Sequence, residues 1–276
     1  MNKNKILLSS ILIVTTGLLA INPSLIGSVN AQPYEEEYDE GSDNGYRYQD
    51  EYDNGYDHGY LEQDKKPQIF PTNKVAELGD KWWQWILSLD VRTNPNPFTE
   101  TGQEGCDIGL QDNNRLLYLV GSDRDSVTGF PVHECKIEKG ITILFPIFNV
   151  FCAGFERDPP LTEAEQRICA NEAMDFPLEL QLEIDGNHIQ NLERQHRVDS
   201  PPGGFEFNAV EGNPITTVLG ESTGVSDGAW ILLKHLTPGE HTITFSGKLD
   251  LRELPGVEAI LEAGATYNLF VKSGYY

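Results

Sequence analysis

Residues 220–224 have the spacing of a catalytic serine motif. They read Gly-Glu-Ser-Thr-Gly and match G-x-S-x-G, in which a sharp turn presents a nucleophilic serine at the N-terminus of a helix. The triad partners of Ser222 would follow in the order aspartate then histidine, and the chain offers Asp227, Asp250, His235 and His241. The required helix is missing, because the apolar, strand-like run 229–233 follows instead. We therefore interpret 220–224 as a glycine-rich loop between strands. An ester hydrolase that uses Ser222 is the alternative.

Two further groups of side chains have the chemistry of metal ligands. Asp123 and Asp125 lie in a loop-like stretch and offer carboxylate oxygens to Ca²⁺. Val127 and Thr128, however, stand where an EF-hand needs a ligand and a glycine, so a solvated hairpin loop is the simpler interpretation. The histidines form neither H-E-x-x-H nor a blue-copper pattern, so we expect them at the surface or in turns and expect no cofactor. They are His58, His133, His188, His196, His235 and His241.

The four cysteines are Cys106, Cys135, Cys152 and Cys169. An even number of cysteines in an exported chain favours disulfide bonds, and these four allow three pairings. We favour Cys106–Cys135 and Cys152–Cys169, because short loops close with the smallest loss of chain entropy. A zinc site is the alternative, although the chain contains no C-x-x-C.

The N-terminus has the parts of a secretory signal peptide. Lys3 and Lys5 precede the apolar stretch Ile6–Ile21, and small residues up to Ala31 fit cleavage after that residue. The apolar stretch is short for a membrane span. We therefore predict that residues 1–31 are a signal and that the protein is secreted or held at the cell surface. An uncleaved anchor is the alternative, and it also places the rest of the chain outside the membrane.

The chain is strongly acidic, with a formal net charge of −23. Nucleic acid and anionic membrane surfaces are therefore poor partners, because both are bound by clustered Lys and Arg. Residues 32–66 hold twelve acids, three bases, seven tyrosines and a single aliphatic residue, Leu61. So little apolar area cannot offset the entropy of ordering, so we predict that this segment is disordered. It is either a solvated spacer or an adhesive segment whose carboxylates bind cations weakly.

Residues 67–276 are long enough for one sizeable core. Apolar periodicity predicts two helices, one over 73–89 and one from a capping box at Thr162 to about Met174. Strand-like patterns cover 115–121, 141–148, 178–184, 215–219, 229–234, 241–251 and 266–272. Because strands outnumber helices and no βαβ rhythm is present, we predict a mainly β fold. The expected architecture is an antiparallel, jelly-roll-like β-sandwich decorated by two helices.

Three of the four tryptophans lie in the stretch WWQW of the first predicted helix. At about 100° per residue, Trp82 and Trp85 fall on the same apolar side of the helix. Both are therefore predicted to anchor the helix on the sheet. Trp83 lies on the shoulder of that side, so it is the tryptophan that we expect to face a cleft or a partner.

The order of several motifs resembles a group of exported, uncharacterised bacterial and archaeal proteins. These motifs, between about residues 75 and 272, are WWQW, NPNPF, Cys106, LLYLVG, Cys135, ITILFPIFNVFC and LTPGEHTITFSG. The resemblance implies export, disulfide bonds and a sandwich fold. It implies no activity and no catalytic residues.

Three functions fit these observations. The first, which we favour, is a non-catalytic domain that binds glycans, envelope material or another protein. The second is a hydrolase of polysaccharides or esters, but no pair among the 43 acids stands out as a glycosidase pair. The third is a structural envelope component without a ligand.

Overall fold

The computed structural model of the chain describes residues 68–69, 73–111, 115–156, 158–176, 178–252 and 259–273. The predicted signal (1–31) and the acidic segment (32–66) lie outside these ranges. Within them, no helix is both long and apolar enough to cross a bilayer.

A seven-stranded sheet is built around the long antiparallel strands β6 (Thr142–Ala153) and β11 (Gly220–Lys234). Three short strands cover the other side of β11 in succession, so this strand is paired at its beginning, middle and end. They are β10 (Phe205–Ala209), β9 (Arg197–Asp199) and β1 (Gln68–Ile69). Beyond β6 lie β3 (Leu116–Tyr118) and β2 (Leu110–Gln111).

The second sheet has six strands and is centred on β12 (Gly239–Asp250) and β13 (Ile260–Lys272). β12 pairs on its other side with β7 (Leu178–Ile184), which is followed by β8 (Asn187–His188). β13 pairs on its other side with β4 (Ser122–Asp123) and, in parallel, with β5 (Val132–Glu138). The fold is therefore mainly β with mostly antiparallel strands, as predicted.

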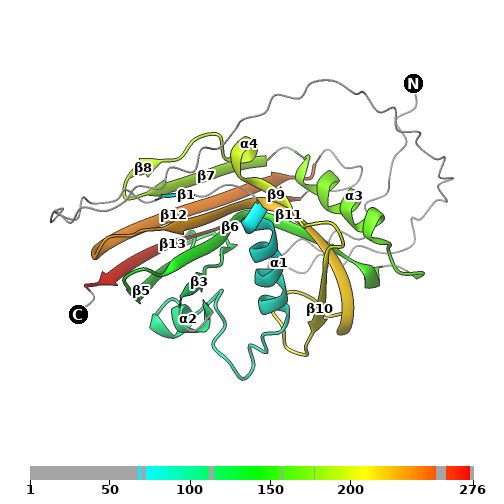
Figure 1. Ribbon diagram of the computed structural model, residues 1–276, viewed down its shortest axis with the longest axis horizontal. Coiled ribbons are helices and arrows are strands. Elements are labelled where there is room, and N and C mark those ends of the chain that lie inside the picture. The colour runs from blue at the N-terminus through cyan, green and yellow to red at the C-terminus, as the bar shows by residue number, and fades with distance from the viewer. Residues whose placement is uncertain are drawn as a thin grey trace, which may run out of the picture.

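The described ranges contain four α-helices beside the sheets, two more than predicted: α1 (Asn73–Leu87), α2 (Gln103–Ile108), α3 (Glu163–Met174) and α4 (Leu192–His196). A 3₁₀ turn covers Gly154–Glu156. The capping box at Thr162 is present, because its hydroxyl accepts from the Glu165 N–H and the Glu165 carboxylate accepts from the Thr162 N–H. Figure 1 shows α1 crossing the middle of the molecule and α3 near one end.

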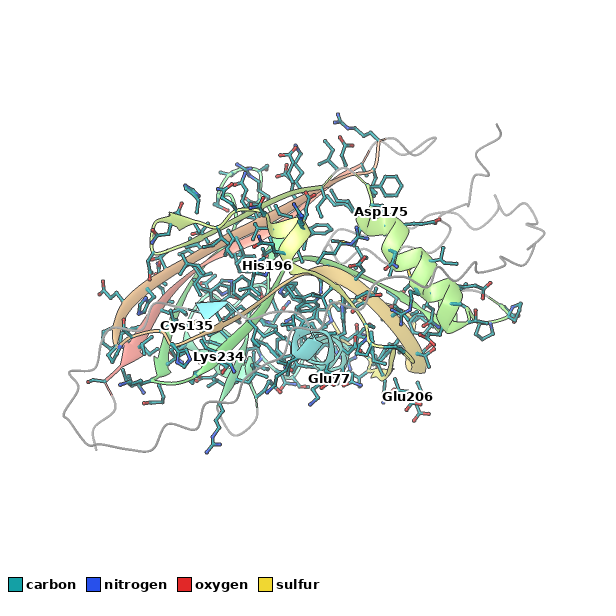
Figure 2. All side chains as sticks on the ribbon, turned by 45° about the horizontal axis from the view of Figure 1, so that its top comes forward. Glu77, Cys135, Asp175, His196, Glu206 and Lys234 are labelled. Carbon is teal, nitrogen blue, oxygen red and sulfur yellow. A yellow bond between two sulfur atoms is a disulfide. The ribbon has the colours of Figure 1, made fainter. Side chains whose placement is uncertain are left out.

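The protein is layered, with the two sheets face to face and α1 on the outer side of the seven-stranded sheet. Successive side chains along β6 and β11 point alternately to the two faces of the seven-stranded sheet. Phe145 and Ile231 pack against the six-stranded sheet, whereas Leu144 and Leu232 pack against α1. A third apolar cluster joins α3 to β6 and to the far end of β12. In Figure 2 α1 is seen nearly end on, at the label of Glu77, beneath curved strands.

The tryptophans of α1 correct one prediction. Trp83 is fully buried, with 0% of its surface exposed, and its ring lies 4.4 Å from that of Phe151. Trp82 is also buried, whereas Trp85 is only partly buried. The prediction that Trp83 faces a cleft or partner is therefore wrong. Trp83 is buried because α1 contacts β10 as well as β6 and β11, so the flank of the helix is covered too.

Both predicted disulfide bonds are present. Cys106–Cys135 joins α2 to β5, and Cys152–Cys169 joins β6 to α3. No cysteine is left unpaired, so a cysteine-ligated zinc site is excluded.

Two predicted boundaries near residue 220 are wrong. Residues 215–219 form a loop and not a strand, because the Asn213 side chain accepts from the N–H groups of Ile215 and Thr216 and so holds the backbone in a turn. Residues 220–224 form the start of β11 and not a glycine-rich loop, and they pair with β10.

Candidate functional site

The structure does not assemble a catalytic triad around Ser222. Ser222 lies in a regular part of β11, so Asp227, five residues further along, projects from the opposite face of the sheet. His235 follows the last residue of β11, about 40 Å from Ser222 at 3.3 Å per residue. His241 and Asp250 lie in β12 of the other sheet. Among the described residues, the one hydrogen bond of the Ser222 hydroxyl is a long one to the Thr223 carbonyl, at 3.5 Å.

Asp125 organises a tight hairpin turn. Its carboxylate accepts from the N–H groups of Val127 and Thr128 and from the Thr128 hydroxyl, at 2.7–2.9 Å. These hydrogen bonds hold the pKa of Asp125 below its usual value. Asp123 lies in β4, opposite Ala263. In the described ranges no three His, Cys, Asp or Glu side chains are grouped to hold a metal ion.

Two histidines have structural roles, and one of them, His133, is buried, which corrects the expectation that all lie at the surface or in turns. His133 is 1% exposed and stacks on Tyr267 with 4.3 Å between ring centroids. Burial lowers the pKa of His133, although the Glu100 carbonyl opposes that change, so the ring is neutral and its Nδ1–H donates to Glu100 O at 3.2 Å. His241 lies between Asp185, 2.7 Å away, and the Thr237 carbonyl, 2.8 Å away.

A buried carboxyl lies between α1 and the seven-stranded sheet. Asp80 is 7% exposed, and its Oδ1 accepts from the hydroxyls of Ser200 at 2.6 Å and Ser226 at 3.4 Å. Burial raises the pKa of Asp80 from 3.8 to about 6, even though both serine hydroxyls lower it. The serines also bond to each other's backbone, so this cluster connects three elements and is closed to solvent. We assign it a structural role.

The outer face of the six-stranded sheet carries a hollow of about 570 Å³. Alternation along β13 turns Thr266, Asn268, Phe270 and Lys272 to solvent, while Tyr267, Leu269 and Val271 enter the core. Phe270 is 46% exposed, the one aromatic residue in this outward row. Its neighbours in register are Lys136 of β5 and Glu240 of β12. The hollow is thus lined by an exposed ring between two oppositely charged side chains.

A row of hydrogen bonds forms the floor of this hollow next to Phe270. The Asn268 amide donates to Glu134 Oε1 at 2.8 Å, and the Thr242 hydroxyl donates to Asn268 Oδ1 at 3.2 Å. These three side chains come from adjacent strands in register, so they hold one another in place. A ligand would therefore meet polar groups that are already ordered.

The edge of the hollow is closed by α2. The Gln103 side chain accepts from the Lys136 N–H at 2.7 Å and donates to the Lys136 carbonyl at 3.2 Å. The Glu134 N–H donates to the Thr101 carbonyl at 2.7 Å. The outer edge of β5 is thereby paired, and Cys106–Cys135 fixes α2 against it.

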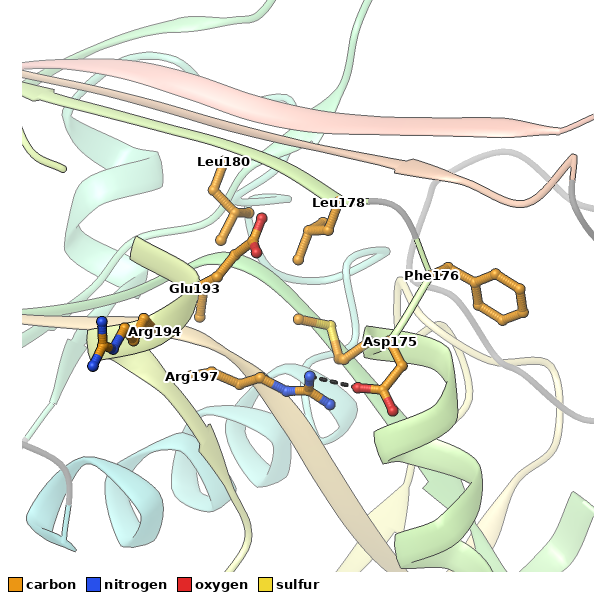
Figure 3. A pocket seen from close by; sticks show the side chains of 9 residues that line it. Asp175, Phe176, Leu178, Leu180, Glu193, Arg194 and Arg197 are labelled. Carbon is orange, nitrogen blue, oxygen red and sulfur yellow. Dashed lines mark hydrogen bonds and ion pairs between the residues drawn. The ribbon is translucent and has the colours of Figure 1, made fainter. Parts of the chain in front are cut away.

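A second cavity, of about 390 Å³, lies where α3 ends beside β7 and α4 (Figure 3). Its apolar lining comes from Met174, Leu178, Leu180 and Ala229, and its charged lining includes Asp175, Glu193 and Arg197. Arg197 is fully engaged, because it donates to Asp175, to the buried Asp227 and to the Asn171 carbonyl at 2.6–3.0 Å. In Figure 3 Glu193 points toward Leu180, whereas Arg194 points the other way.

The residues of the hollow were missed in the sequence, although a signal for them existed. In the strand 266–272 every second residue, beginning at Thr266, is polar except Phe270. An aromatic residue at a position that alternation assigns to the solvent side indicates an exposed ring. The pattern of 132–138 also alternates, but its inward residues include a histidine and a cysteine, which hid the strand. The register that brings Glu134 beside Asn268 joins segments more than 100 residues apart and has no local signal, whereas Thr242 lies only 26 residues from Asn268.

No protein-family model, no curated protein and no solved structure matches this chain, so no relative supplies a function or a site by analogy.

Proposed function

We propose that this is a secreted or surface-held, non-catalytic β-sandwich protein that binds an envelope glycan in the hollow around Phe270. The observation that carries the proposal is this exposed aromatic ring set among ordered polar side chains. The negative face of an aromatic ring attracts the weakly positive C–H groups of a sugar, and amide, carboxylate and hydroxyl groups beside it pair with sugar hydroxyls. The signal-like N-terminus and the two disulfide bonds support export.

A binding function agrees with the arrangement of the polar groups better than hydrolysis does. The serine-centred alternative loses its basis, since Ser222 and the candidate histidines are far apart. Glu134 and Glu240 both line the hollow, but they lie on the two strands that flank β13. Glu134 is opposite Asn268 and Glu240 is opposite Phe270, so they are also offset by two residues along β13. Glu134 is also held by the Asn268 amide, which favours a fixed hydrogen-bonding role.

The test is affinity electrophoresis of the mature protein through gels that contain envelope or cell-wall polysaccharides. We expect retardation by at least one polysaccharide, and Phe270→Ala should weaken it at least tenfold, about 1.4 kcal/mol. Ile260→Ala is the matched control, because Ile260 is 39% exposed on the same face of β13 but about 33 Å away along the strand. It should leave retardation unchanged.

Two results would contradict this function. Equal losses for Phe270→Ala and Ile260→Ala, or no retardation in any gel, would place binding elsewhere or remove it. Release of reducing ends from a retained polysaccharide would show a hydrolase, and Glu134→Gln and Glu240→Gln would then identify its carboxylates.

A further inference from the structure

Charged side chains on the outer face of the six-stranded sheet are paired across neighbouring strands. Lys272 of β13 lies 2.6 Å from Glu138 of β5, and Lys248 of β12 lies 2.8 Å from Glu179 of β7. Both pairs join residues that are opposite each other in register, which is how opposite charges stabilise a sheet. Further outward carboxylates of these strands also have hydrogen-bonding or ionic partners, namely Glu134, Glu183, Asp250 and Glu262.

Lys136 and Glu240 are two exceptions, and both line the hollow at Phe270. Among the described residues, neither the Lys136 ammonium nor the Glu240 carboxylate takes part in a hydrogen bond or an ion pair. Both side chains are exposed to solvent. A ligand can therefore bond to either charge without breaking a bond inside the protein.

The register of the sheet keeps these two charges apart. Phe270 of β13 is opposite Lys136 of β5 on one side and opposite Glu240 of β12 on the other. Neighbouring strands are about 4.8 Å apart, so the backbones of β5 and β12 are separated here by about 10 Å. The Phe270 ring stands between the two charges, which therefore do not pair as Lys272 and Glu138 do.

The other two titratable side chains of the hollow are already bonded. Glu134 accepts from the Asn268 amide at 2.8 Å. His241 lies 2.7 Å from the Asp185 carboxylate and 2.8 Å from the Thr237 carbonyl. The hollow thus offers a ligand one ammonium and one carboxylate that are not bonded to the described part of the chain.

This arrangement selects a ligand by the position of its charges and not by its net charge. A ligand that is only anionic would meet Lys136 but also the carboxylates of Glu134 and Glu240. A ligand that is only cationic would be attracted by Glu240 and repelled by Lys136. A ligand with both signs, spaced like the two side chains, pairs with each of them and is favoured over the other two classes.

We propose that the hollow recognises a zwitterionic saccharide, which carries an amino group and a carboxylate or phosphate on neighbouring sugar units. One sugar ring packs on Phe270, the ammonium group bonds to Glu240, and the anionic group bonds to Lys136. This inference rests on the proposed glycan-binding function and adds the class of glycan. Because both charges are exposed, each contact is weak and the two together give the selectivity.

The probe is a disaccharide of glucosamine and N-acetylmuramic acid, which has a free amine on one sugar and a carboxylate on the other. N-acetylation removes the ammonium, a methyl ester removes the carboxylate, and a fourth form has both changes. NMR titration of the mature protein at about pH 6, where an ordinary amine is protonated and a carboxylic acid is ionised, gives the affinity of each form. The Phe270 ring and the Asn268 side-chain amide report the site. The zwitterionic form should bind about tenfold more tightly than the form with both changes, and about 1 M salt should remove this difference.

Lys136→Met and Glu240→Gln assign the two charges. Lys136→Met should abolish the preference for the free carboxylate over its methyl ester while keeping the preference for the amine, and Glu240→Gln should do the reverse. Lys248→Met and Glu179→Gln are the matched controls, because they remove the same charges on the same face of the sheet. Lys248 lies about 26 Å from Glu240 along β12. Both controls should leave all four affinities within about twofold.

The outcomes separate this inference from the glycan-binding function itself. Equal affinities for the four forms, all weakened by Phe270→Ala, would overturn the zwitterionic ligand and leave glycan binding intact. The same follows if none of the four forms binds to a protein whose retardation by a polysaccharide depends on Phe270. Tightest binding of a form with a single charge, or equal effects of the hollow variants and their controls, would also overturn the inference. If no gel retards the protein and no form binds, both proposals fall.

Discussion

The tryptophans of α1 show how differently neighbouring residues of one type can contribute. Trp82 and Trp83 are both buried and meet at right angles with 5.1 Å between ring centroids. The Trp82 Nε1–H donates to the Leu119 carbonyl at 3.1 Å, whereas the buried Trp83 Nε1 has no hydrogen-bond partner among the described residues. Gly79 of the same helix lets α1 lie close to Trp230 of β11, because a Cβ at position 79 would lie 3.1 Å from the Trp230 ring. The two indole rings are thus both buried, but only the N–H group of Trp82 has a hydrogen-bond acceptor among the described residues.

This difference predicts which of two substitutions, Trp82→Phe or Trp83→Phe, lowers the free energy of unfolding more. Trp82→Phe leaves the Leu119 carbonyl without its donor, whereas Trp83→Phe removes a donor that has no acceptor. Unsatisfied buried polar groups cost about 1–3 kcal/mol, so Trp82→Phe should destabilise the protein by at least about 1 kcal/mol more than Trp83→Phe. Urea unfolding measures both. Equal losses would mean that the cavity left by the smaller ring dominates.

Asp80 predicts a pH dependence of stability. Its folded pKa of about 6 lies above the value of 3.8 for an unburied aspartate, so the folded state binds more protons between these pH values. Its contribution to stability is therefore fully present below about pH 4 and is lost as the pH rises through about 6. The Asp80→Asn variant has no carboxyl at this position and should not show this loss. The stability of the variant minus that of the wild type should therefore rise by up to about 3 kcal/mol between pH 4 and pH 7.

Urea unfolding at several pH values checks this expectation. Glu77→Gln is the matched control, because Glu77 is exposed on the same helix, and it should leave the pH dependence as in the wild type. A parallel pH dependence for Asp80→Asn and the wild type would show that the buried carboxyl does not cause the effect.

At the scale of elements, α3 is held on the sheets by a covalent bond and by two arginines. Cys152–Cys169 ties its middle to β6. Arg167 reaches from α3 to Asp199 at 2.7 Å and to the carbonyls of Ser200 and Pro201. Arg197 reaches back from β9 to the last turn of the helix, at Asn171 O and Asp175. The helix has only a modest apolar side, so these bonds replace part of the usual packing.

Removal of Arg197 should therefore be costly. Asp227 is 2% exposed, and burial already raises its pKa, although Arg197 opposes that rise. Arg197→Met leaves this carboxylate buried without its partner, so we expect a loss of about 3–5 kcal/mol. The double substitution Arg197→Met with Asp227→Asn should recover part of that loss, because no charge is left in the interior. Chemical unfolding of the three proteins checks this, and a double variant no more stable than Arg197→Met would contradict it.

At the scale of the whole molecule, patterns within single segments were predictable and contacts between distant segments were not. The alternation of 178–184, the capping box at Thr162 and the local cysteine pairs all lie within short stretches, and the structure confirms them. The wrapping of β10 against α1, which buries Trp83, joins segments more than 100 residues apart. The hollow at Phe270 depends on the same kind of long-range register.

The disulfide bonds also act on the whole molecule, through the unfolded chain. They close loops of 29 and 17 residues, so each should contribute about 3 kcal/mol on the loop-entropy model. Replacing both cysteines of one pair by serine should lower the free energy of unfolding by about that amount while leaving the far-UV circular dichroism unchanged. Calorimetry of the two double variants measures the loss, and an unchanged melting temperature for either would show that its bridge adds no stability.

The position of β13 has a consequence for the timing of folding. This strand lies inside its sheet, with β12 on one side and β4 and β5 on the other. β5 leaves the ribosome more than 100 residues before its parallel partner does, so the sheet cannot close before β13 has been made. Until then β5 waits without this neighbour, and its backbone groups on that side remain available to water or to a chaperone.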